Sequence, residues 1–233
     1  MMNPTKARPQ TSSAVLKRGG EFALRSDNAV LRNTYRLLGL TLLFSGVVAL
    51  TSAALSLPHP GLVLTLAGYF GLLFLTARLR NSYWGLVSVF ALTGFMGYTL
   101  GPVINAYLSM ANGPALVATA LGITGVAFFG LSAYARMTQS VNMLKFGTFL
   151  FVGILTAFAL GLVSVFFDMP ALGLAVSGLF VLLMCGLIVY ETQNIINGGE
   201  TNYIMATVTL FVAVFNLFSS LLHLLGYFGG EDG

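Results

Sequence analysis

Long apolar runs separated by short polar segments dominate the hydrophobic pattern of this chain. Each run is long enough for a helix to cross a hydrocarbon core of roughly 30 Å at about 1.5 Å per residue. The runs are continuous rather than alternating with a period of two, which favours helices over a barrel. The pattern predicts an all-α integral membrane protein, a seven-transmembrane-helix bundle. The seven runs cover about residues 37–57, 61–77, 84–107, 114–134, 146–167, 171–194 and 203–228.

The last run differs from the others because it carries a narrow polar seam. The seam residues follow the spacing i, i+3, i+4 and i+7, which places them on one face of a helix. In lipid, a polar seam must face protein or water. We therefore expect the last helix to be central in the bundle. The seam consists of Asn216, Ser219, Ser220 and His223.

Composition and charge support this class and add an orientation. Hydrophobic residues make up 57% of the chain and charged residues 8%, whereas a soluble domain carries about 25% charged residues. All eleven Lys and Arg residues lie in or beside the N-terminal segment and the loops 78–83 and 135–145, which seven spans place on one side. The positive-inside rule then predicts a cytoplasmic N-terminus and a periplasmic C-terminus. The turn at 197–202 has no basic residue, so it is assigned to the same side of the membrane only because successive spans alternate in direction.

Three parts follow along the chain. Residues 1–31 are polar and rich in Pro, Ser, Thr and Gly, so we expect a flexible cytoplasmic N-terminal tail. Residues 32–228 form the seven-helix membrane domain, and residues 229–233 form a short periplasmic tail. The N-terminal tail has two interpretations: a leader that only sets topology, or a segment gripped by a partner.

Glu191 is the only acidic residue set inside an apolar run rather than at its edge. An ion-binding or proton-sensing role is physically available to such a carboxyl group. The alternative is that Glu191 reaches the interface and hydrogen-bonds a neighbouring helix end. Asn194, Asn216 and His223 are further candidates, but calcium needs six or more oxygen ligands and normally several carboxylates, which disfavours calcium binding here. A lone histidine makes no zinc site, so no metal is expected.

The third run contains residues that affect helix packing. Gly97 and Gly101 form a GxxxG pair, which permits close approach of a second helix. Pro102 frees a backbone carbonyl one turn earlier and can kink the helix.

The motifs of several enzyme classes are absent from the sequence. It contains no HExxH, no GxSxG, no P-loop and no pair of aspartates within the apolar runs. Catalysis and a cofactor are therefore not expected. The basic residues are few and have a topogenic distribution, so membrane lipids rather than nucleic acid are the expected surroundings.

Several segments make the chain resemble the Bax inhibitor-1 family, also known by its transmembrane Bax-inhibitor motif. The similarity covers roughly residues 30–228, and the segment before the last run is the most specific. The resemblance rests on residues 31–35, 60–66, 93–98, 101–102, 190–193 and 198–204.

The resemblance is greatest to the bacterial inner-membrane members that modulate FtsH, a membrane-anchored AAA protease. It implies a multi-pass inner-membrane protein that inhibits FtsH, is slowly degraded by it, and associates with its HflKC assembly. A tail on the cytoplasmic side would give the protease a segment to grip. Another branch of the family implies a pH-sensitive calcium or cation leak channel, in which two acidic residues share a proton. Glu191 matches the first of these positions, whereas the second falls on Ala213, which cannot share a proton.

Overall fold

The computed structural model describes residues 11–138 and 143–229, with side chains from residue 29 onward. Over these residues the chain is helical with short turns and contains no strand. Seven helices are each long and apolar enough to cross a membrane, which confirms the predicted fold class. The helices are α1 (Thr11–Ala54), α2 (Leu62–Leu79), α3 (Tyr83–Leu108), α4 (Gly113–Met137), α5 (Met143–Phe166), α6 (Pro170–Ile196) and α7 (Tyr203–Gly229).

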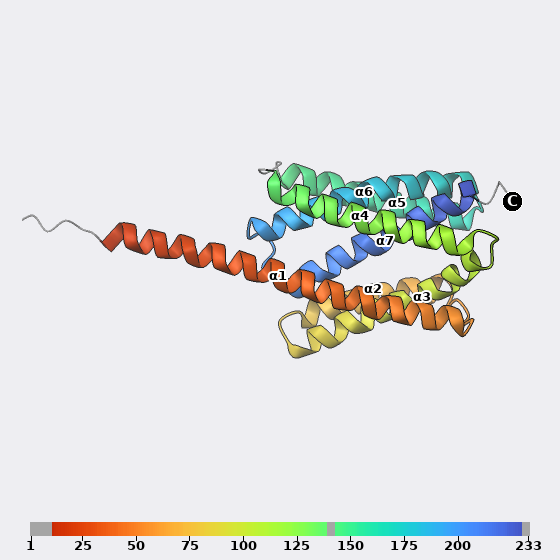
Figure 1. The fold of residues 1–233 in the computed structure, drawn as a ribbon, viewed down its shortest axis with the longest axis horizontal. Coiled ribbons are helices and arrows are strands. Elements are labelled where there is room, and N and C mark those ends of the chain that lie inside the picture. Colours follow the sequence, from red (N-terminus) through yellow and green to blue (C-terminus); the bar gives the residue numbers. More distant parts are fainter. Residues whose placement is uncertain (1–10, 139–142, 230–233) are drawn as a thin grey trace, which may run out of the picture.

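The last helix is central, as the sequence predicts. Figure 1 shows α1, α2 and α3 on one side of the molecule and α4, α5 and α6 on the other, with α7 crossing between them. Helix α7 packs against α1, α3, α4 and α6. Its residues Leu210, Phe211, Ala213 and Leu217 are buried almost completely. The core of the bundle is therefore built around α7.

Helix α1 begins earlier than the sequence analysis expected. It starts at Thr11, so residues 11–31 of the expected N-terminal tail are helical, while the flexibility of this segment stays a prediction. This segment has no proline and contains several strong helix formers, including Ala, Leu, Lys, Arg and Glu. In Figure 1 the first half of α1 projects beyond the bundle. Residues 1–10 of the expected N-terminal tail and 230–233 of the expected C-terminal tail lie outside the described residues.

One end of the bundle carries the basic side chains that the structure describes. The projecting part of α1, the turn between α2 and α3 and the turn between α6 and α7 all lie at this end in Figure 1. We call it the basic end, and its position on the cytoplasmic side stays a prediction of the positive-inside rule. Its basic residues are Arg32, Arg36, Arg78, Arg80, Arg136 and Lys145.

Two glycines allow α3 to lie unusually close to α1. A Cβ atom added at Gly97 would collide with the backbone oxygen and side chain of Ser45. At Gly101 it would collide with the side chain of Ser52 and come within 2.9 Å of the Ala49 carbonyl oxygen. The absence of side chains at these positions lets the two backbones touch, as small residues do between membrane helices.

The same contact satisfies the backbone group that Pro102 leaves free. Helix α3 continues through Pro102, which has no N–H to donate to the carbonyl of Tyr98 four residues earlier. The hydroxyl of Ser52 on α1 donates to that carbonyl oxygen at 3.1 Å. A neighbouring helix thus replaces the missing backbone hydrogen bond, which matters where no water is available.

Replacing Ser52 by alanine tests whether the Ser52 hydroxyl takes the place of the missing backbone donor. We expect a loss of about 1 kcal/mol in unfolding free energy, because the Tyr98 carbonyl would lose its partner within a span. The measurement is unfolding in mixed detergent micelles with increasing SDS. Thr51→Ala is the matched control, since its exposed hydroxyl bonds within its own helix, to the Val47 carbonyl. Equal stability of the two variants would contradict the role assigned to Ser52.

Candidate functional site

The turn between α6 and α7 has a defined backbone structure at the basic end. Gly198 has a φ of 71°, in the left-handed region that favours glycine. The N–H groups of Gly199 and Glu200 both donate to the Asn194 carbonyl, at 2.8 and 3.2 Å. These bonds close the end of α6 and direct the chain toward α7. The positive φ accounts for Gly198, and the Asn194 side chain, which would collide with a Cβ atom at the next position, accounts for Gly199.

Asn202 joins this turn to the start of α7 and to the turn between α2 and α3. Its side-chain oxygen accepts hydrogen bonds from the N–H groups of Ile204 and Met205, at 3.0 and 3.1 Å. This arrangement caps the helix. Its side-chain nitrogen donates to the Arg80 carbonyl at 3.1 Å and to the Asn81 side-chain oxygen at 2.9 Å. One side chain therefore joins the start of α7 to the turn that follows α2.

Two substitutions separate the roles of Asn202. Asn202→Ala removes both the cap and the connection, and we expect it to lower stability by about 1–2 kcal/mol. Asn202→Asp keeps the capping oxygen and loses the donor to Arg80 and Asn81. Hydrogen exchange at the Ile204 and Met205 amides should accelerate in the alanine variant and stay slow in the aspartate variant. Equally fast exchange in both would show that the cap is not what protects these amides.

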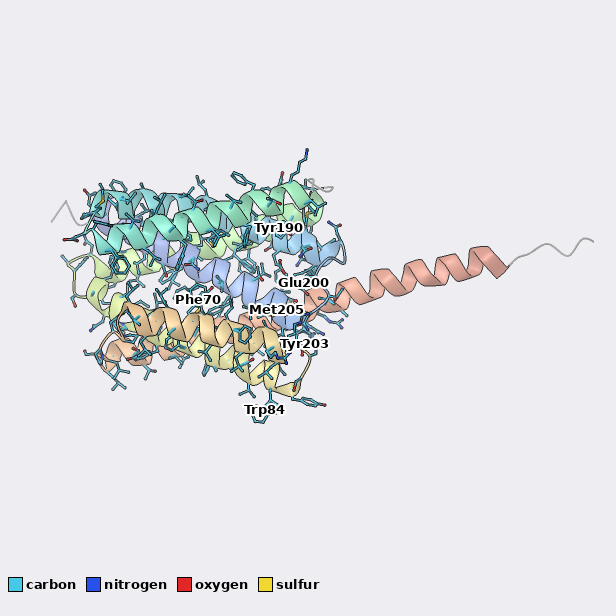
Figure 2. All side chains as sticks on the ribbon, turned by 180° about the vertical axis from the view of Figure 1, so that it is seen from behind. Phe70, Trp84, Tyr190, Glu200, Tyr203 and Met205 are labelled. Atoms are coloured by element: carbon cyan, nitrogen blue, oxygen red, sulfur yellow. The ribbon has the colours of Figure 1, made fainter. Side chains whose placement is uncertain are left out.

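Glu191 is buried near this turn, in the last two turns of α6. Only 4% of its surface is exposed. The side chain of Asn194 hydrogen-bonds to it, and the Glu200 carboxyl lies close enough to interact with it electrostatically. Oxygen Oε1 of Glu200 itself accepts a hydrogen bond from the Asn202 N–H at 2.7 Å. Figure 2 labels Glu200 in this turn, beside the start of α7. Glu191 and Asn194 thus belong to one polar group at the basic end.

A second polar contact at the basic end joins α1, α4 and α6. The hydroxyl groups of Tyr35 and Thr192 are 3.1 Å apart. The guanidinium of Arg136 lies over the Tyr35 ring, 5.2 Å from its centroid, a cation–π arrangement. Gln193 is 2% exposed. Its amide nitrogen donates to the Thr138 carbonyl, while its Oε1 has no hydrogen-bond partner among the described residues.

The other candidate residues lie elsewhere, so the polar seam is not a single site. Asn216 lines an apolar cavity in the middle of the bundle, and its amide donates to the Val212 carbonyl at 2.8 Å. His223 is exposed at the opposite end, with Nδ1 2.7 Å from the hydroxyl of Ser177 on α6. The two seam residues between them face protein, because Ser220 is buried and the Ser219 hydroxyl is buried without a hydrogen-bond partner among the described residues.

Sequence reasoning missed several residues of the basic end. Tyr35, Arg136 and Gln193 come from three different helices, and no spacing along the chain relates them. The capping role of Asn202 did carry a signal, because an asparagine just before an apolar run is a recognised helix start. Among the residues that the structure describes, no group of three or more His, Cys, Asp or Glu side chains could hold a metal ion.

The helices and their packing define a polytopic membrane protein built around its last helix. Residues 27–230 match the sequence profile of a family described as Inhibitor of apoptosis-promoting Bax1. The chain belongs to this family, the Bax inhibitor-1 family, which confirms the resemblance found in the sequence.

Relatives with assigned names narrow the comparison. The chain is 49% identical over 205 residues to the Modulator of FtsH protease YccA of Escherichia coli strain K12, covering 88% of this chain and 93% of the relative. A counterpart with the same identity and coverage in Escherichia coli O6:H1 is named Inner membrane protein YccA. An uncharacterized protein of Pseudomonas aeruginosa is 51% identical over 208 residues, covering 89% of this chain and 93% of the relative. The chain is a multi-pass protein of the bacterial inner membrane, and the two Escherichia coli relatives are named as a protease modulator and as an inner membrane protein.

Proposed function

We propose that this protein regulates the FtsH protease as an inhibitor that is itself a slow substrate, and that it has no catalytic activity of its own. The observation that carries the proposal is the 49% identity to a relative named as a modulator of FtsH, over 88% of this chain. Association with the HflKC assembly is part of the same proposal. Membrane lipids are the other partners that we propose.

The projecting part of α1 supports the substrate half of the proposal. An ATP-driven protease needs a segment outside the membrane to grip, and the N-terminal segment extends from the basic end, which we predict to be cytoplasmic. Pulling on this segment transmits force first to α1 within the bundle.

The packing of α1 supports the inhibitor half. Helix α1 lies against α3, α6 and α7, and its contact with α3 is backbone against backbone at Gly97 and Gly101. Extraction must separate these surfaces before any later helix can follow. A substrate that is gripped readily and extracted slowly occupies the protease and excludes other substrates.

A competition experiment tests the proposal. FtsH is reconstituted in proteoliposomes with a second membrane substrate, and the degradation of that substrate is followed with increasing amounts of this protein. We expect degradation to slow in a saturable way, while this protein itself disappears slowly. An unrelated seven-helix membrane protein serves as the control. Unchanged degradation at saturating amounts would contradict the inhibitory function.

A second candidate function is a proton-sensitive cation leak gated near Glu191. Its support is the deep burial of Glu191 close to the Glu200 carboxyl, because acidic groups within spans often mark ion or proton paths. Ala213 weakens this candidate, since it is buried in α7 at the position where the family's second acidic residue would fall.

Glu191→Gln tests the leak directly. If the carboxyl gates a pathway, the variant should change cation flux into liposomes or its dependence on pH, because an amide does not take up a proton in this range. Wild type and variant are compared at acid and neutral pH, with Glu200→Gln as the control for the neighbouring carboxyl. Identical flux under all conditions would remove the leak channel from consideration.

A further inference from the structure

An apolar cleft runs between α2 and the central helix α7. Helix α2 packs mainly on α3, so its opposite face leaves a cavity of about 620 Å³ toward α7. Phe70, Phe74 and Leu73 of α2 face Met205, Val208 and Val212 of α7 across it. Figure 2 shows Phe70 and Met205 in the space between these two helices. We call this cavity the α2–α7 cleft.

The depth of the cleft matches one leaflet of a bilayer. Along α2 it extends from Ala77 to Tyr69, and along α7 from Met205 to Val212, which corresponds to roughly 10–12 Å of helix. One leaflet contributes about 15 Å to the hydrocarbon core. A smaller cavity of about 300 Å³ shares Tyr69 and Val212 with the cleft and continues it past this point. Together the two cavities follow α2 from Ala77 to Thr65, and the larger one lies toward the basic end.

The mouth of the cleft at the basic end carries positive charge. Arg78 follows Phe74 by one helical turn, so it lies on the same face of α2 as Phe70 and Phe74. Arg78 and Arg80 are both exposed. Glu200 in the turn before α7 supplies one opposing carboxylate, which the two arginines outnumber. Arg78 thus lies in the last turn of α2 and Arg80 at its C-cap, so both arginines follow the apolar lining of the cleft at the basic end.

We propose that the α2–α7 cleft binds an anionic phospholipid, with one acyl chain in the cleft and its phosphate on Arg78 and Arg80. Apolar side chains within a span suit an acyl chain, and arginine at the membrane surface suits an anionic headgroup. A transmembrane helix of a partner would need an apolar strip over the full core of about 30 Å, whereas the cleft and its continuation follow α2 only from Ala77 to Thr65, roughly 18 Å of helix. Charge and depth together favour the lipid.

Tryptophan fluorescence in vesicles tests the proposal, because Trp84 is the only tryptophan of the chain. A reporter in the cleft is made by Tyr69→Trp in a Trp84→Phe background. The vesicles consist of unlabelled phosphatidylcholine with a small fraction of a lipid that has brominated acyl chains. The brominated lipid is either phosphatidylglycerol or phosphatidylcholine, and the two are compared at matched mole fractions. We expect brominated phosphatidylglycerol to quench the reporter at lower mole fraction. Arg78→Ala with Arg80→Ala should weaken this preference by about 25-fold, at about fivefold for each arginine.

Three controls separate the cleft from the general lipid surface. Phe129→Trp in the same background reports from α4, where the side chain is 71% exposed, and should show no headgroup preference. Arg32→Ala removes an exposed arginine of the basic end and should leave the preference unchanged. Thr209→Trp repeats the measurement from the α7 side of the cleft if Tyr69→Trp does not fold.

The outcomes decide the proposal without reference to FtsH. A preference for phosphatidylglycerol in the cleft, lost with the two arginines, supports it. Equal quenching by both lipids would overturn it, because the cleft would then hold any acyl chain. Absence of quenching in the cleft, with normal quenching at position 129, would also overturn it, since something other than lipid would fill the space.

Discussion

Deletion of residues 1–25 is expected to lengthen the lifetime of the protein in cells severalfold and to make it a stronger inhibitor of FtsH. The deletion removes most of the segment that projects from the bundle but leaves the span that begins at Ala29. Without a segment to grip, FtsH would bind the membrane domain without extracting it. The lifetime is measured after protein synthesis is stopped, together with the lifetime of a second FtsH substrate.

Two controls accompany the deletion. Arg32 and Arg36 remain and should preserve the orientation, which a reporter fused to the C-terminus verifies. Replacing residues 1–25 by a Gly/Ser-rich segment of equal length should restore degradation if the protease needs only length. If the truncated protein is degraded at the normal rate, the N-terminal segment is not where extraction starts.

Gly101→Val is expected to cause one of the largest losses of stability among substitutions at the contact between α1 and α3. The new side chain would collide with Ser52 and approach the Ala49 carbonyl, and a backbone contact cannot be relieved by rotating a side chain. Displacing Ser52 would also break its hydrogen bond to the Tyr98 carbonyl. We expect a loss of about 3 kcal/mol, at the upper end for an overpacked contact. SDS-induced unfolding in micelles measures the loss.

Gly122→Val is the matched control for Gly101→Val. It places the same side chain on a membrane helix, but nothing lies within 4 Å of a Cβ atom at Gly122. We expect its stability to stay within about 0.5 kcal/mol of the wild type. Similar losses at Gly101 and Gly122 would mean that valine disfavours these helices generally and that the contact between α1 and α3 is not special.

The membrane-spanning helices and the central place of α7 could be predicted from the sequence for a physical reason. In a bilayer the backbone must satisfy its own hydrogen bonds, so a long apolar run has few alternatives to a helix. The polar seam of α7 then required a protein environment over at least part of its length. The local structure of residues 11–31 was predicted less well, because its polar composition suggested a flexible tail while its helix formers favour a helix.

The candidate residues were only partly predictable. Glu191 was found because a carboxyl group within an apolar run is rare. The cation–π contact of Arg136 with Tyr35 was not found, because the two residues are distant in sequence and meet only when α1 and α4 pack. The hydrogen bond from Ser52 to the Tyr98 carbonyl was missed for the same reason. Pro102 predicted a backbone carbonyl without its helical donor, but nothing in the sequence identified the side chain that bonds to it.

Co-purification from native membranes tests the central claim most directly. The protein carries a C-terminal tag, is extracted in a mild detergent, and is compared with a variant lacking residues 1–25. We predict recovery of FtsH with both forms, which would locate the principal contact in the membrane domain and leave the N-terminal segment to initiate extraction. Failure to recover FtsH with either form would contradict the proposed function and direct attention to ion flux through Glu191.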